Sequence, residues 1–219
     1  MEIKVFKQIM SWNQDVSDRI KEQLNKEQIF MINIMGSPGT GKTTLITALI
    51  EALRERYNLG VIEADIAGEI DARHIGQLNI PVVQLQTDGA CHIEAMAVEH
   101  MLPSFDLQQL DVLLVENIGN LVCPAEFDLG EDLRLAILSI PEGDDKVEKY
   151  PLLFSRADAL LLNKYDMKPY FDFDDDRVIH QTYCINPNLQ VFKISSRSKE
   201  GLERLTEWLI GRISAKLGK

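Results

Sequence analysis

The feature that most constrains the fold is a glycine-rich segment of eight residues, Gly36-Ser37-Pro38-Gly39-Thr40-Gly41-Lys42-Thr43. It matches the pattern G-x-x-x-x-G-K-S/T, and it follows a nearly continuous apolar run, 29–35, that is typical of a strand buried on both faces. The next segment, 43–57, has the apolar periodicity of a helix. A glycine-rich turn between strand and helix points successive N–H groups at phosphate oxygens, and the helix N-terminus adds partial positive charge. The sequence therefore predicts a phosphate-binding loop comprising residues 36–43 and Thr44.

The rest of the chain alternates strands with helices. Apolar runs predict strands at 60–62, 81–85, 112–115, 133–140, 159–162 and 191–194, and helical patterns lie at 91–101 and at the C-terminus, where Leu202, Leu205, Leu209 and Ile213 form one face. Such alternation predicts a doubly wound, mostly parallel α/β sheet with helices on both faces, the P-loop hydrolase architecture. An amphipathic helix with Trp12, Val16, Ile20 and Leu24 on one face precedes it. We expect a helical arm at 1–27 and one domain at 28–219.

Composition excludes several classes of function. The chain has 219 residues and a net charge of −11, which argues against a nucleic-acid partner because phosphate neutralisation needs clustered Lys and Arg. No apolar stretch reaches the roughly 18 residues of a membrane span, and the N-terminus has no signal pattern, so we expect a cytoplasmic protein without a membrane partner. The acidic run 172–176 is interpreted as a solvated surface loop, with a divalent-cation site as the alternative.

A second polar motif, Asn163-Lys164-Tyr165-Asp166, follows the predicted strand 159–162. It resembles the N-K-x-D motif by which GTPases recognise the base. The Asp166 carboxylate can accept hydrogen bonds from both the ring N–H and the exocyclic amine of guanine, which adenine does not offer in that arrangement. Ser195 and Ser196, after the next strand, resemble the further guanine loop of such proteins. The sequence therefore favours GTP and GDP over adenine nucleotides.

A magnesium site and the catalytic groups are predicted around the same loop. Lys42 is expected to reach the β- and γ-phosphates, and the Thr43 hydroxyl to bind Mg²⁺. The usual D-x-x-G is absent, but Glu116 follows the strand 112–115 and can take the role of the Asp, with the Gly119 N–H near the γ-phosphate. Asp65 and Asp71 both follow the preceding strand. Either can supply a further Mg²⁺ ligand. Asp71 is preferred for that role and is also counted among the catalytic groups.

The chain has three cysteines, an odd number that makes a disulfide framework implausible, so they are thiols or metal ligands. Adjacent Cys91 and His92 are predicted to open the helix 91–101, and Cys123 follows the Glu116 segment. Two thiolates and an imidazole suit Zn²⁺ or Ni²⁺. The spacing of these residues does not by itself indicate a metal site, because the sequence has no C-x-x-C motif. On spacing alone, the simpler interpretation is that the cysteines are incidental buried side chains.

A family resemblance changes that interpretation. Over roughly residues 12 to 215, the chain resembles the HypB family of hydrogenase nickel-incorporation GTPases. The resemblance is carried by the phosphate loop and by the segments 87–92, 116–125, 127–131, 142–146, 149–151 and 163–166. The resemblance implies a slow, regulated GTPase that dimerises with GTP and shares a nickel or zinc site built from Cys91, His92 and Cys123. It also implies other hydrogenase maturation proteins and the hydrogenase large subunit as partners. Residues 1–35 contain neither Cys nor His, unlike many members, which carry nickel-binding Cys or His there.

Two alternatives stay open from the sequence. The related urease accessory GTPases place metal ligands in Cys-Pro-His, whereas this chain has Cys123-Pro124-Ala125 and its His beside Cys91. The other alternative is a zinc-stabilised nucleotide-binding module without turnover.

Overall fold

The apolar run before the phosphate loop forms the central strand of the sheet in the computed structural model, which describes residues 2–65, 78–86 and 89–219. This strand, β1, is buried along its whole length between β4 and β5. The seven strands of the described sheet run in the order β3-β2-β4-β1-β5-β6-β7, and every pair is parallel. Their bounds are β1 Phe30–Gly36, β2 Leu59–Asp65, β3 Val82–Gln86, β4 Val112–Glu116, β5 Leu133–Ser139, β6 Ala159–Asn163 and β7 Gln190–Lys193.

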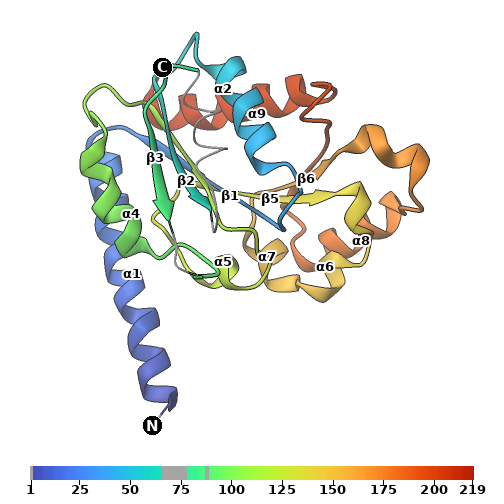
Figure 1. Ribbon diagram of the computed structural model, residues 1–219, viewed down its shortest axis with the longest axis horizontal. Helices are drawn as coiled ribbons and strands as arrows, with labels where there is room; N and C mark the ends of the chain where they lie inside the picture. The colour runs from blue at the N-terminus through green and yellow to red at the C-terminus, as the bar shows by residue number, and fades with distance from the viewer. Residues whose placement is uncertain (1, 66–77, 87–88) are drawn as a thin grey trace.

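Helices cover both faces of this sheet (Figure 1). One face packs on α2 and α9, and the other packs on α1 and α4 beside β2 and β4, then on α6, α7 and α8 beside β5 and β6. The bounds are α1 Glu2–Lys26, α2 Lys42–Leu53, α4 Ala95–Met101, α5 Cys123–Glu126, α6 Lys146–Lys149, α7 Pro151–Arg156, α8 Asp175–Ile185 and α9 Leu202–Leu217, with 3₁₀ turns η1 Leu102–Ser104, η2 Ile140–Glu142 and η3 Tyr165–Tyr170. The predicted doubly wound parallel sheet and the N-terminal helix are confirmed.

Two local predictions need correction. The helix predicted at 91–101 begins only at Ala95, because Glu94 has an extended backbone, so Cys91 and His92 lie in the loop before it. The acidic run is not simply a solvated loop, since Asp175 and Asp176 form the first turn of α8 and the Asp174 side chain caps that helix. Carboxylates in a first helical turn are favoured by the partial positive charge of the helix N-terminus.

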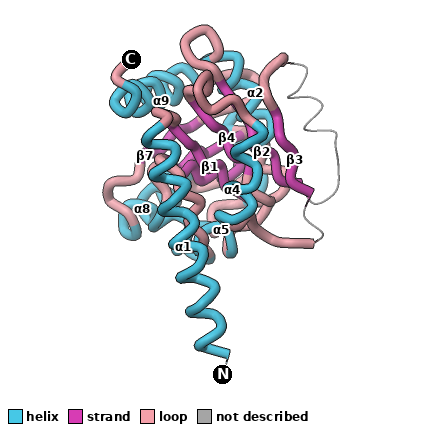
Figure 2. Tube along the Cα trace, turned by 90° about the vertical axis from the view of Figure 1, so that its left-hand side faces the viewer, coloured by secondary structure: helices cyan, strands magenta, loops and turns pink. Residues whose placement is uncertain are grey.

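The first helix has two different halves. Near its C-terminal end, Ile20 and Leu24 are fully buried against α4 and the sheet, whereas Trp12 is 71% exposed. Figure 2 shows the N-terminal half of α1 projecting away from the rest of the molecule. The division of the chain at residue 27 stays a prediction. None of the helices in the described ranges is long and apolar enough to cross a membrane.

The burial of Leu24 leads to a stability prediction. Leu24→Ala should lower the free energy of unfolding by about 2–5 kcal/mol, because it removes a fully buried side chain and leaves a cavity. Trp12→Ala, on the exposed half of the same helix, is the matched control and should have a much smaller effect. Urea denaturation of both variants measures this, and equal losses would contradict the assignment of Leu24 to the core.

Candidate nucleotide and metal site

The phosphate loop lies at the carboxyl edge of the sheet and lines a cavity of about 410 Å³. Gly39 and Gly41 have positive φ angles of 78° and 94°, which L-residues rarely adopt. A Cβ on Gly41 would lie 2.7 Å from the Asn163 amide nitrogen. The cavity is lined by Pro38, Gly39, Gly41, Lys42, Thr43, Thr44, Glu63, Ala64, Glu116, Ile118, Gly119 and Lys164.

Lys42 is held inside this loop. Its ammonium group donates hydrogen bonds to the carbonyl oxygens of Gly36 at 3.3 Å and Ser37 at 3.2 Å, and the side chain is buried. The Thr40 hydroxyl also donates to the Ser37 carbonyl, at 2.9 Å. A positive charge is thereby fixed beside the cavity, where it can pair with a phosphate.

Acidic groups also line this cavity. The Thr43 hydroxyl donates to Glu116 Oε1 at 2.8 Å, which brings together two of the predicted magnesium ligands. Glu63, a residue that sequence reasoning missed, is buried and pairs in register with Glu116 across β2 and β4. The signal for it was an acidic residue directly after the apolar run predicted as the strand 60–62. The Asp65 side chain and the whole of Asp71 lie outside the described part of the chain.

The predicted base-recognition residues approach the same loop from β6 and β7. The Asn163 side chain donates to the Thr40 carbonyl at 2.8 Å and accepts from the Ser196 hydroxyl at 2.9 Å. Lys164 Nζ donates to the Gly39 carbonyl at 2.6 Å. Asp166 is exposed at the start of η3, and Ser195 is buried after β7.

The cysteines and histidine singled out from the sequence converge. The sulfur atoms of Cys91 and Cys123 lie 3.0 Å apart, and Cys91 Sγ lies 3.6 Å from His92 Nδ1. One possible ligand atom from each of the three residues lies within 4.8 Å of the others. The geometry therefore fits three ligands on one metal ion.

Protonation at this cluster also fits a metal site. Burial lowers the pKa of His92 against the opposing charges of Glu94 and Glu126, so its imidazole is neutral near pH 7 and available as a ligand. The ring stacks on Phe127 with centroids 4.0 Å apart. The hydrogen bond with Cys91, and then burial, raise the pKa of the Cys123 thiol. A metal ion must therefore displace a thiol proton to bind.

The segment after β4 connects the metal cluster with the phosphate loop. Asn120 pairs with Gly36 in an isolated antiparallel bridge, and its side chain donates to the Cys91 carbonyl at 3.1 Å. A Cβ on Gly119 would lie 2.7 Å from Pro38, so this segment touches the loop directly. Asn117 accepts a hydrogen bond from the Ile93 N–H at 3.4 Å. The sequence pattern alone gives no role to Asn117 or Asn120.

A parallel sheet whose central strand ends in a glycine-rich phosphate loop defines a P-loop nucleotide-binding protein. Similarity to known proteins shows which family of P-loop proteins the chain belongs to. The model of the CobW/HypB/UreG nucleotide-binding domain matches residues 30–193. The hydrogenase maturation factor HypB of Azotobacter vinelandii is 40% identical over 94% of this chain and 68% of its own length. The probable hydrogenase maturation factor HypB of Methanocaldococcus jannaschii is 34% identical over 94% of both chains.

A solved structure agrees with these relatives. The crystal structure of HypB from Helicobacter pylori in complex with nickel has a TM-score of 0.87 and 34% identity, covering 94% of this chain and 96% of that one. The chain belongs to the HypB family of hydrogenase maturation factors.

Proposed function

We propose that this chain is a GTP-hydrolysing metallochaperone that binds nickel or zinc and assists nickel insertion into nickel–iron hydrogenase. The observation that carries the proposal is the contact between the two parts of the site. The segment that holds Cys91 and leads to Cys123 also bridges to Gly36 of the phosphate loop. The relatives named hydrogenase maturation factor, and the nickel complex of one homologue, support hydrogenase as the destination and nickel as the cargo.

GTP is the proposed nucleotide. Residues 36–44 with Gly119 would bind the phosphates, while Asn163, Lys164, Asp166, Ser195 and Ser196 would form the base side of the site. Asn163 supports this because it joins the base motif to the phosphate loop through its bond to the Thr40 carbonyl. A base bound by Asp166 would then be placed at a fixed distance from phosphates bound by Lys42.

Mg²⁺ fits the polar groups that line the cavity beside Lys42. The Thr43 hydroxyl and the Glu116 carboxylate are already within 2.8 Å of each other, and hard oxygen ligands suit Mg²⁺. Asp65 or Asp71 would add a ligand, directly or through water. Bound Mg²⁺ would neutralise phosphate charge during a slow, regulated hydrolysis, and Lys42 would stabilise the charge that develops on the γ-phosphate. Asp71 and Glu116 are the proposed acidic groups of the catalytic site.

A homodimer would complete the metal site. Cys91, His92 and Cys123 supply three ligands, which leaves a fourth position for a ligand from a second copy. In this scheme GTP orders the segment after Glu116, the two copies come together, and hydrolysis releases the cargo to other maturation proteins or to the hydrogenase large subunit. We place this process in the cytoplasm, where hydrogenase precursors would be met.

Asp166→Asn tests the nucleotide assignment. The amide presents a donor where guanine presents its own donors, so GTP affinity should fall at least about tenfold, roughly one well-placed charged hydrogen bond. Xanthosine triphosphate should bind the variant better than GTP does. Competition of GTP, ATP and xanthosine triphosphate for wild type and variant measures this. A wild type that prefers ATP would contradict the proposal.

The alternatives make different predictions. A zinc-stabilised module without turnover would bind GTP and release no phosphate, which a phosphate-release assay detects. A urease-type accessory role would be supported if the purified chain activated apo-urease but not a hydrogenase precursor. The ligand set favours the hydrogenase role, because His92 comes from the loop before α4 and Ala125 takes the place of the His in Cys-Pro-His.

A further inference from the structure

One carboxylate of the acidic run is buried and fully engaged. Asp175, the first residue of α8, is only 6% exposed. Its two oxygens each lie 2.6 Å from an ammonium group, one from Lys168 and one from Lys193, and the Tyr165 hydroxyl donates to it as well. Each carboxylate oxygen of Asp175 is already paired with an ammonium group. Asp175 therefore joins these three side chains to the start of α8.

One of those partners, Tyr165, belongs to the base-recognition motif, and the other two lie near its ring. Tyr165 lies inside that motif, directly before Asp166, and its backbone N–H donates to the Ile194 carbonyl at 3.0 Å. Its ring packs partly buried against the core near α8, and the ammonium groups of Lys168 and Lys193 lie 5.6 and 5.2 Å from the ring centroid. Asp175 therefore draws η3, β7 and α8 together around the residue next to Asp166.

The motif needs such an anchor because its backbone is unusual. Lys164 has a φ of 54°, in the left-handed region that residues other than glycine rarely occupy. Strained conformations of this kind persist only where the surroundings hold them on several sides. Asn163 holds one end through the Thr40 carbonyl and Ser196, and Tyr165 holds the other through Asp175.

We propose that Asp175 is a positioning residue for base selection, which holds the loop through Tyr165 so that the Asp166 carboxylate faces the guanine N1–H and 2-amino groups. This inference rests on the guanine recognition proposed above. Asp175 touches no nucleotide in this scheme and acts only through its neighbour. Burial opposes its ionisation, but hydrogen bonds from Lys168, Lys193 and Tyr165 outweigh that effect and lower its pKa to about 2, so the anchor is charged at any physiological pH.

The test compares three triphosphates that differ only in the base. Asp175→Asn should weaken GTP binding about tenfold, which is about 1.4 kcal/mol. Inosine triphosphate lacks the 2-amino group, so one of the two bonds to Asp166 is missing and its affinity should fall less. ATP binding should not change, because the phosphate loop is untouched. Tyr165→Phe removes only the hydroxyl. It should weaken the binding of GTP most, that of inosine triphosphate less and that of ATP not at all, with smaller changes than in Asp175→Asn.

Asp145→Asn is the matched control. Asp145 also pairs with two lysines, Lys146 and Lys149, and its pKa is likewise lowered to about 2 by their hydrogen bonds. It is more exposed than Asp175, and its lysine partners belong to α6 rather than to the base-recognition motif. All three affinities should match the wild type in this variant.

Calorimetric titration and thermal melting of the four proteins separate the outcomes. Equal losses for all three nucleotides in Asp175→Asn, with a lower Tm, would reduce Asp175 to a structural role and overturn the inference. Unchanged GTP affinity in that variant, with a wild type that prefers GTP over ATP, would overturn the inference alone. A wild type without GTP preference would overturn the guanine assignment and the inference together.

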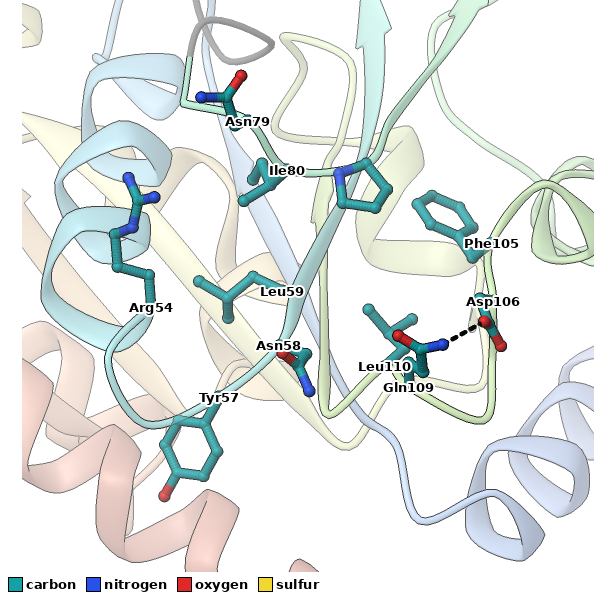
Figure 3. Close-up of a pocket in the computed structure, with 11 residues that line it drawn as sticks. Arg54, Tyr57, Asn58, Leu59, Asn79, Ile80, Phe105, Asp106, Gln109 and Leu110 are labelled. Atoms are coloured by element: carbon teal, nitrogen blue, oxygen red, sulfur yellow. Dashed lines mark hydrogen bonds between the residues drawn. The ribbon is translucent and has the colours of Figure 1, made fainter.

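Another open cavity lies at the opposite, amino edge of the sheet and has a volume of about 310 Å³ (Figure 3). Apolar side chains of Leu59, Ile80 and Leu110 contribute to its lining, and Gln109 donates a hydrogen bond to Asp106 there. Among the described residues that line it, no charged side chain is buried, so we assign no ligand to this cavity.

Discussion

Replacing Lys42 with methionine should lower GTP and GDP affinity by roughly 100-fold, which is about 2.7 kcal/mol. The buried ammonium group is held among the loop carbonyls, so its loss removes a charged donor beside the cavity in which we propose that the phosphates bind. Methionine keeps the apolar stem, so the sheet and α2 should be retained. Equilibrium titration with a fluorescent GDP analogue measures the affinity, and far-UV circular dichroism checks the fold.

Lys149→Met is the control for a general effect of charge, because Lys149 is an exposed lysine paired only on the surface. It should leave nucleotide affinity unchanged. Nearly normal GTP binding by Lys42→Met would contradict the assignment of residues 36–43 as the phosphate site. Loss of binding by both variants would point to net charge as the cause.

Replacing Cys123 with alanine should weaken the binding of nickel and of zinc more than about 10-fold. Loss of a residue that only hydrogen-bonds to a metal ligand typically lowers metal affinity by roughly 10–100-fold, and loss of a ligand itself should lower it further. The reason is that Cys123 supplies one of only three clustered ligand atoms in the described part of the chain. Cys184→Ala is the matched control, because Cys184 is an exposed free thiol on α8 and belongs to no cluster of three ligands among the described residues.

Competition with a chromophoric chelator measures both metals for both variants. Equal losses in the two variants would mean that thiols bind metal wherever they lie on the surface. Unchanged affinity in Cys123→Ala would contradict the metal site itself. Nucleotide affinity without metal should stay near the wild-type value in both, since neither cysteine lines the phosphate cavity.

The sequence predicts the parts of the site that follow directly from strands. The carboxyl ends of parallel strands meet at one edge of a sheet, so polar motifs after predicted strands converge. Lys42 and Thr43 after β1, Glu116 at the end of β4 and Asn163 at the end of β6 all follow this rule. Their short-range patterns are enough to predict that these residues lie close together.

The remaining parts depend on contacts that no local pattern contains. Glu63 meets Glu116 only because β2 is the neighbour of β4 in the sheet order. Cys91 lies against Cys123 because the side chain of Asn120 joins the loop before α4 to the segment before α5. The burial of Asp175 requires the docking of α8 beside η3, and an acidic run by itself predicts exposure.

We infer that the nucleotide state controls the metal site, since Asn120 contacts both the phosphate loop and the Cys91 loop. Titration of nickel into wild-type protein loaded with a non-hydrolysable GTP analogue or with GDP tests it most directly, with the oligomeric state followed by light scattering. We predict tighter nickel binding with the GTP analogue, together with dimerisation, and a smaller difference in Asn120→Ala. Identical nickel affinities in the two nucleotide states of the wild type would contradict the claim.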